Sequence, residues 1–153
     1  MFCMEYDEAV AIVSEMFRIG QWASNEFGER HAILDNDIEI RVFQGARDVM
    51  VLQGMFGEPI PNASVANANE IKLRYLLQAN FIRLIHHSDV LSIDKKTGRL
   101  ATTRHIRILE ASLDFVMDTI ESFVQNVDFW DATLKRKQSF SSLSPLLNLF
   151  RKK

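Results

Sequence analysis

Residues 71–134, IKLRYLLQANFIRLIHHSDVLSIDKKTGRLATTRHIRILEASLDFVMDTIESFVQNVDFWDATL, decide the fold predicted for this chain. A strongly apolar segment is followed by the turn Asp94-Lys95-Lys96-Thr97-Gly98-Arg99, where Gly98 suits the left-handed position of a hairpin loop. Apolar residues then recur at helical spacing up to Leu134. The predicted elements are a helix over 67–85, strands over 89–93 and 100–106, and a long helix over 113–134 that carries Phe129-Trp130 near its end.

The preceding residues add one more helix and three strands. Apolar side chains fall on one face between Asp7 and Gly20, which predicts an amphipathic helix. Turn residues near Asn36 and Gly45 separate three strand-like runs. These predicted strands cover 31–35, 38–43 and 49–56. The fold class is therefore predicted as α+β, with an antiparallel sheet, helices and the order α-β-β-β-α-β-β-α.

Length and charge divide the chain into two parts. Residues 1–137 are predicted to form one domain, and residues 138–153 a flexible Ser-rich tail with an apolar and basic end. Residues 1–134 contain all 20 acidic residues but 12 of the 18 Lys and Arg, so this body has a charge of 12 − 20 = −8. Such a body repels phosphate backbones, and we expect no nucleic-acid partner.

The motifs that carry catalysis or bind cofactors do not occur. The glycines never take the spacing of a phosphate-binding loop, and there is no Gly-x-Ser-x-Gly motif. His86 and His87 are adjacent, so their side chains point in different directions and do not form a shared metal site. We therefore predict no catalytic residues, no metal and no cofactor, and conclude that the chain is not an enzyme.

The sequence also predicts where the protein is found. Cys3 is the only cysteine, which excludes an internal disulfide and is typical of a reducing compartment. The apolar runs are shorter than the roughly 20 residues of a membrane span. The first residues lack the features of a signal peptide. We expect a cytosolic protein without stable insertion into a membrane.

The helix predicted over 67–85 has more apolar surface than one core needs. Its apolar residues form two stripes on opposite sides, and a helix with two such stripes lies between layers. The second layer is either a partner subunit or another part of the same chain. We expect a homodimer in which the second stripe forms the interface. The first stripe is Leu73, Leu76, Leu77, Asn80, Phe81 and Leu84, and the second is Ile71, Tyr75, Ile82 and Ile85.

The strand predicted over 49–56 is also apolar on both faces. Two interpretations stay open, because such a strand is either buried between two layers or exposes one face for docking. The docking interpretation uses apolar side chains that the chain's own core is least expected to cover. The residues predicted to bind a protein partner are Ile12, Ile19, Phe43, Met50, Leu52 and Phe56.

Four short segments carry a resemblance to a known family. They are Leu76-Leu77-Gln78-Ala79-Asn80, Leu91-Ser92-Ile93-Asp94, Thr97-Gly98-Arg99-Leu100 and Phe129-Trp130. With the order of the elements, they resemble the class I-like type III secretion chaperones of the Tir-chaperone (CesT) family over roughly 6–134. The chain departs from the family at Asn36, where the family often has Gly, and in its basic tail.

The resemblance implies a homodimeric bacterial cytosolic chaperone that serves virulence and uses no cofactor. Such a chaperone binds an extended N-terminal segment of a secreted effector, keeps it competent for secretion and delivers it to the secretion apparatus. The resemblance does not extend to the tail; its basic end is expected, on its own charge, to contact the secretion machinery through the secretion ATPase. Two alternatives stay open: a regulatory protein of the same fold that sequesters a regulator of secretion, and an α+β enzyme subunit whose active residues a partner supplies.

Overall fold

The computed structural model describes residues 4–34, 37–57, 74, 76–83 and 88–135. Residues 74 and 76–83 are helical, and the latter are called the 76–83 helix below. Ile71, Tyr75, Ile85 and the tail over 138–153 lie outside the described residues. The other elements are α1 (Tyr6–Met16), β1 (Ala23–Ser24), β2 (Arg30–Ile33), β3 (Glu39–Gln44), β4 (Val49–Phe56), β5 (Val90–Ile93), β6 (Leu100–Arg107) and α3 (Leu113–Lys135).

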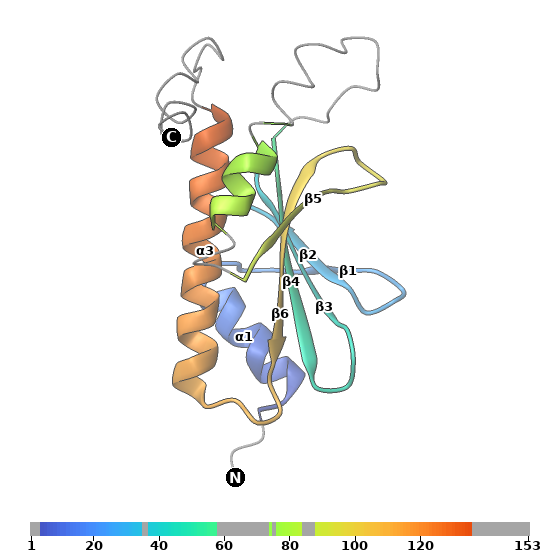
Figure 1. Ribbon diagram of the computed structural model, residues 1–153. Helices are drawn as coiled ribbons and strands as arrows, with labels where there is room; N and C mark the ends of the chain where they lie inside the picture. Colours follow the sequence, from blue (N-terminus) through green and yellow to red (C-terminus); the bar gives the residue numbers. More distant parts are fainter. Residues whose placement is uncertain (1–3, 35–36, 58–73, 75, 84–87, 136–153) are drawn as a thin grey trace.

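The strands form one antiparallel sheet of six strands in the order β1-β2-β3-β4-β6-β5. Helices α1 and α3 lie against one face of this sheet, and the 76–83 helix lies beside α3 (Figure 1). The predicted α+β class is thus confirmed. Strand β1 was not predicted, because its two residues are too few to show alternation.

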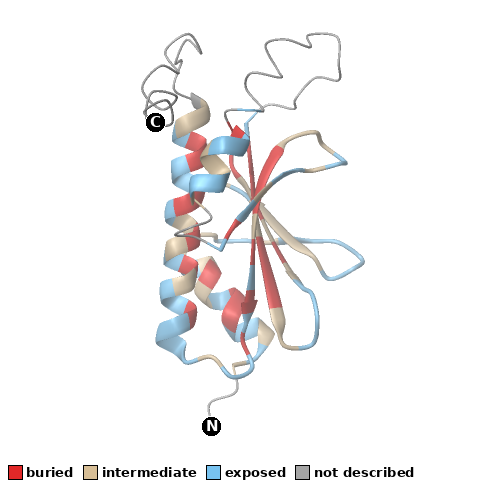
Figure 2. Ribbon diagram, in the orientation of Figure 1, coloured by how far each residue is buried: buried red, intermediate tan, exposed pale blue. Residues whose placement is uncertain are grey.

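The core lies between the sheet and the helices. Side chains alternate along each strand, so every second residue of β3, β4 and β6 points toward α1 and α3. The predicted apolar stripe of α3 faces them and is the most deeply buried part of that helix (Figure 2). Its fully buried residues are Val116, Ile120, Phe123, Val127 and Trp130.

The structure overturns one expectation for β4. Met50, Leu52 and Phe56 were predicted to be exposed for docking, but all three are 0% exposed and belong to the core. The reason is the position of β4 between β3 and β6, in the middle of the sheet and beneath the helices. The other interpretation, a strand buried on both faces, therefore holds.

Helix α1 ends at Met16 and not at the predicted Gly20. Arg18 has a φ of 55°, and the Ile19 N–H donates to the Ser14 carbonyl at 2.7 Å. The Arg18 N–H donates to the Glu15 carbonyl at 3.1 Å. This pair of bonds is a Schellman motif, which ends a helix by a residue in the left-handed conformation. Glycine usually takes that position, so an arginine there is no signal of a helix end.

The packing of α3 on the sheet depends on Gly54 in β4. A Cβ atom at Gly54 would lie 2.8 Å from Cγ2 of Val127, closer than Cβ contacts in folded proteins. Neither the Val127 side chain nor the Gly54 backbone can move away easily, because Val127 is buried in the middle of α3 and β4 is a central strand.

We expect Gly54→Ala to lower the free energy of unfolding by about 1–3 kcal/mol, the usual cost of overpacking a core. Urea denaturation followed by circular dichroism measures it. The matched control is the Gly54→Ala/Val127→Ala double variant, whose loss should be smaller than the sum of the two single losses. Additive losses would show that the contact with Val127 is not the cause.

Candidate protein-binding site

A groove lies at the end of α1 and has a volume of about 850 Å³. The turn after α1 forms one wall, the end of β2 forms the second, and Asp128 of α3 the third. The groove is called the α1 groove below. Its lining residues are Phe17, Arg18, Ile19, Gly20, Gln21, Ala32, Ile33, Leu34 and Asp128.

The first wall of the α1 groove is held in place by aromatic side chains. The ring of Phe17 packs edge-on against that of Phe123 in α3, with 6.3 Å between their centroids. The indole N–H of Trp22 donates to Ser14 Oγ at 2.6 Å, which ties the chain after the turn back to α1. Together with the Schellman motif at Arg18, these contacts form the groove before any partner binds.

The α1 groove is lined by apolar residues and by the polar side chains of Arg18, Gln21 and Asp128. Burial, and to a smaller extent the neighbouring Asp131 carboxylate, raises the pKa of Asp128 above its usual value. A raised pKa means that the surroundings disfavour the charged carboxylate. A positive charge brought next to Asp128 would relieve this, so the groove suits a segment with apolar side chains and a basic one.

The structure places the predicted partner-binding residues in three different environments. Ile19 lines the α1 groove, and Ile12 is half-buried against the core. Phe43 is half-buried, and its position in β3 puts it on the face of the sheet opposite the helices. The three β4 residues are core, as described above. Sequence reasoning missed Ile33 and Asp128 as lining residues, since only the fold brings β2 and α3 to the end of α1.

A second apolar surface lies on the 76–83 helix and β5, and is called the helix–β5 surface below. Leu76 is buried in the core, whereas Leu77 is 64% and Phe81 72% exposed. The described part of the predicted first stripe is therefore split between the core and the surface, and Leu73 and Leu84 of this stripe lie outside the described residues. Of the predicted interface residues, only Ile82 lies in the described part of the chain, and it is exposed. The exposed apolar residues of this surface are Leu77, Phe81, Ile82 and Ile93.

A buried polar network holds the helix–β5 surface against the rest of the protein. Arg104 of β6 forms an ion pair with Asp89, which precedes β5, and donates to the Thr119 carbonyl of α3 at 2.7 Å. The Asn126 amide donates to Asp89 Oδ2 at 2.7 Å and accepts from Arg83 Nε at 2.8 Å. The guanidinium of Arg83 also lies 3.7 Å from the ring centre of Phe129. One set of contacts thus fixes β5 and the 76–83 helix to α3.

We expect Asp89→Asn to lower the free energy of unfolding by about 3–5 kcal/mol, because it leaves the buried Arg104 guanidinium without a counter-charge. The control is Asp118→Asn on the exposed face of α3, which should change stability by no more than about 0.5 kcal/mol. Chemical denaturation of the three proteins gives the comparison. Equal stabilities of the Asp89 variant and the wild type would show that the ion pair does not hold the network.

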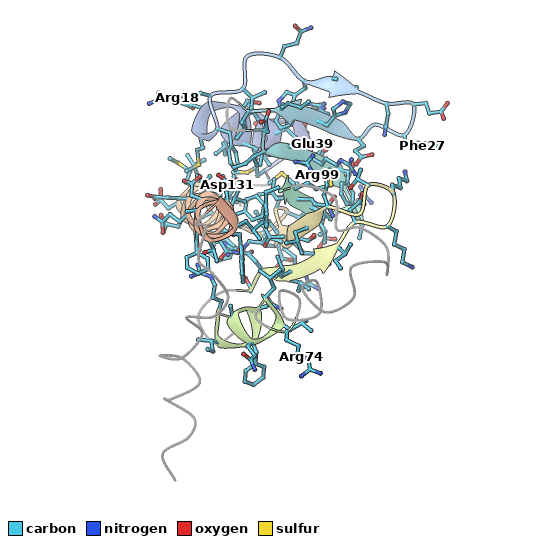
Figure 3. All side chains as sticks on the ribbon, turned by 90° about the horizontal axis from the view of Figure 1, so that it is seen from above. Arg18, Phe27, Glu39, Arg74, Arg99 and Asp131 are labelled. Atoms are coloured by element: carbon cyan, nitrogen blue, oxygen red, sulfur yellow. The ribbon has the colours of Figure 1, made fainter. Side chains whose placement is uncertain are left out.

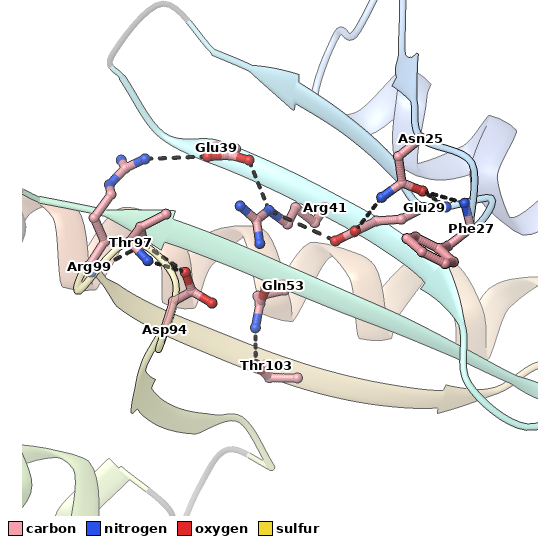
Figure 4. Close-up of polar contacts among 10 residues, drawn as sticks. All are labelled: Asn25, Phe27, Glu29, Glu39, Arg41, Gln53, Asp94, Thr97, Arg99 and Thr103. Carbon is pink, nitrogen blue, oxygen red and sulfur yellow. Dashed lines mark hydrogen bonds and ion pairs between the residues drawn. The ribbon is translucent and has the colours of Figure 1, made fainter.

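The face of the sheet away from the helices carries charged side chains that are already paired, beside the buried apolar residues Val51 and Met55. Arg41 Nε lies 2.8 Å from one oxygen of Glu39 and 3.9 Å from Glu29, and Arg99 Nη1 lies 3.4 Å from the other oxygen of Glu39 (Figure 4). Gln53 donates to Thr103 at 3.3 Å further along this face. Because these groups satisfy one another, this face is a poor docking site for an apolar segment.

The described residues contain no group of three or more His, Cys, Asp or Glu side chains placed to hold a metal ion. In the same part of the chain, no helix has the length and apolar character needed to cross a membrane.

Comparisons with known proteins agree on one family. The model of the Tir chaperone protein (CesT) family matches residues 23–131, which is more than half of the chain. No curated protein sequence matches the chain.

Three solved structures are similar to the fold. The HopA1–SchA chaperone–effector complex is 17% identical, with a TM-score of 0.56 and coverage of 83% of this chain and 93% of the other. The ExsC–ExsE complex is 15% identical, with a TM-score of 0.60 and coverage of 90% of this chain and 100% of the other. The Yersinia pestis type III secretion chaperone SycH, in complex with a fragment of YscM2, is 13% identical, with a TM-score of 0.51 and coverage of 81% and 98%. At these identities the structural matches establish the fold alone.

Proposed function

The chain belongs to the Tir chaperone protein (CesT) family, and we propose that it acts in the bacterial cytosol as a type III secretion chaperone. As a member of a chaperone family it is a binding protein and not an enzyme. In this proposal, the α1 groove binds an extended N-terminal segment of a secreted effector. The chaperone keeps this segment competent for secretion and delivers it to the secretion apparatus.

The observation that carries the proposal is a groove with polar and apolar lining residues beside a sheet edge that β1 does not cover. Strand β1 pairs only with Arg30 and His31, so β2 extends past it. The Leu34 N–H donates at 2.8 Å to the carbonyl of Ile38, which precedes β3, and hydrogen-bonded pairs alternate along an antiparallel ladder. The backbone N–H and C=O of Ile33 therefore point away from β3, toward the side that β1 leaves uncovered. An extended segment could pair there and place its apolar side chains in the groove.

The same groove would also serve the regulatory alternative. Backbone pairing and apolar pockets bind an extended segment whatever the rest of its protein does. All three similar structures are complexes with a protein partner, which supports partner binding by this fold. The identity of the captured protein separates the two readings: a secreted protein supports an escort, and a transcription-linked protein supports a regulator.

We expect Ile33→Pro and Ile19→Glu to reduce capture of the cargo at least tenfold without unfolding the protein. Ile33→Pro removes the outward N–H that would pair with the cargo but no bond to β3. Ile19→Glu places a charge in the groove that must be desolvated when the cargo binds. Ile33 is 72% exposed, so the fold should tolerate its replacement. Tagged proteins expressed in bacteria with the secretion system, followed by mass spectrometry and binding of N-terminal fragments of the captured protein, give the measurement.

Phe27→Glu is the matched control for these two variants. Phe27 is 86% exposed, and Figure 3 shows it at the far end of the β1–β2 hairpin from Arg18 of the groove. The control should capture as much cargo as the wild type. Full capture by both groove variants would show that the cargo binds elsewhere.

We also propose that the protein is a homodimer joined through the helix–β5 surface. Leu77 and Phe81 are four residues apart, so they share one face of the helix, and both are exposed. Exposed apolar side chains that gather on one face mark interaction sites. The network around Asp89 and Arg104 presents the patch on a fixed support, which favours a specific contact over a loose one. The dimer would place two α1 grooves in one particle, so one long unfolded segment could reach both.

We expect Phe81→Glu to convert the dimer into a monomer, because it puts a charge in the centre of the apolar patch. Light scattering should give about 35.2 kDa, twice the chain mass of 17.6 kDa, for the wild type and 17.6 kDa for the variant. Phe27→Glu again serves as the control and should keep the mass of the dimer. A wild-type mass of 17.6 kDa at micromolar concentration would exclude the dimer.

A further inference from the structure

Among the described residues, no strand pairs with the second half of the outer edge of β6. It has eight residues, from Leu100 to Arg107, but β5 pairs only with residues 100–103. In the part of the chain that the structure describes, residues 104–107 pair with β4 on one side and with no strand on the other. Ser88 and Asp89, which precede β5, are not in a strand, and Asp89 is turned inward to Arg104.

The ladder between β4 and β6 shows which backbone groups face this edge. The Ile108 N–H donates to the Asp48 carbonyl at 2.9 Å, and the register pairs Ile106 with Met50 and Arg104 with Leu52. Because hydrogen-bonded pairs alternate in an antiparallel ladder, the even-numbered residues of β6 bond to β4. The N–H and C=O groups of His105 and Arg107 therefore point outward, at the spacing that one added strand would match.

A cavity of about 520 Å³ separates this edge from α3. Its walls are rigid, because the Arg104 side chain is bound to Asp89 and to the Thr119 carbonyl, and Thr119 Oγ1 donates to the Phe115 carbonyl at 2.7 Å. Phe115 is 55% exposed and provides an apolar surface at the mouth. The lining residues are Ser88, Arg104, His105, Ile106, Arg107, Phe115, Asp118, Thr119 and Ser122.

We propose that this edge cavity is a second strand-addition site, which binds an extended polypeptide segment between β6 and α3. Unpaired backbone groups along an edge are satisfied by an extended chain, whereas a helix already bonds its own backbone groups. The charges at the cavity offset one another, since Asp89 pairs with Arg104, and Arg107 and Asp118 line the cavity with opposite charges. This balance favours an uncharged apolar segment over a phosphate group or a nucleic acid.

The occupant is a second stretch of the same unfolded cargo, so this inference rests on the proposed function. The two strand-addition sites lie toward opposite ends of the strand order, one beside β2 and one beside β6. A cargo segment that pairs at both would lie across the chaperone and remain extended between the sites. Such a segment cannot form its own sheet or helix while it is bound.

The test uses a probe that does not depend on knowing the cargo, the uncharged peptide acetyl-Thr-Val-Thr-Val-Thr-amide. It is titrated into 15N-labelled full-length protein, and the amide signals of His105 and Arg107 are followed by NMR. His105→Pro removes the outward N–H without removing a bond to β4, and His105→Ala removes the side chain but keeps that N–H. Both amides should shift in the wild type, the Ala variant should bind within about twofold of it, and the Pro variant at least tenfold more weakly.

A second probe tests the site with the protein unaltered. The same peptide with methyl groups on the backbone nitrogens of its central valine, threonine and valine cannot donate to the edge, and it should leave both amide signals unchanged. If the methylated peptide still shifts both amides, or if the Arg107 amide of the Pro variant titrates with the wild-type affinity, the edge does not bind by strand addition and the proposal is wrong.

Two further outcomes would overturn the proposal. Absence of any shift at His105 and Arg107 at millimolar peptide would show that the edge does not accept a strand. Slow hydrogen exchange of both amides in the free protein would show that their N–H groups are already bonded. If His105→Pro also lowered the light-scattering mass, the bonded partner would be a second copy of the chain. Neither outcome touches the α1 groove, whose variants are measured with the captured cargo.

Discussion

The buried ion pair between Asp89 and Arg104 is the contact on which the arrangement of the C-terminal part depends. Arg104 belongs to β6, Asp89 leads into β5, and their hydrogen bonds continue to Thr119 and Asn126 of α3 and to Arg83 of the 76–83 helix. Two buried charges cost solvation, and that cost is offset only when every polar atom has a partner. The network is therefore satisfied in only one arrangement of these elements. This arrangement fixes the position of the helix–β5 surface, and Arg104 forms part of the wall of the edge cavity.

In the part of the chain that the structure describes, the helices lie on one face of the sheet, and this constraint decides where a partner can bind. The opposite face is occupied by the paired side chains of Glu29, Glu39, Arg41 and Arg99. Arg99 also donates to the carbonyls of Gly57 and Asp37, which fixes the ends of β4 and β3. An apolar partner is therefore directed to the margins of the sheet, where the outer strands are shorter than their neighbours and backbone groups remain available. Both proposed strand-addition sites lie at such margins.

The α1 groove shows how a local irregularity produces a binding surface. Arg18 adopts a left-handed conformation that costs a non-glycine residue about 1 kcal/mol, and the turn that it makes creates the first wall. The packing of Phe17 against Phe123 and the bond from Trp22 to Ser14 then hold that wall. A groove formed in advance loses little conformational entropy on binding, so weak and unspecific contacts with an unfolded segment are enough.

The sequence by itself determined the elements and the family resemblance. The hairpin with Gly98, the buried stripe of α3 and the α+β order were predictable, because local periodicity and turn chemistry specify them. The tertiary structure alone decided which apolar faces are covered. Met50, Leu52 and Phe56 are core because β4 became a central strand, whereas Leu77 and Phe81 are exposed because the 76–83 helix packs through Leu76. Periodicity shows that a face is apolar, but the neighbour that covers it comes from distant parts of the chain. For the same reason, Ile33 and Asp128 of the groove could not be found from the sequence.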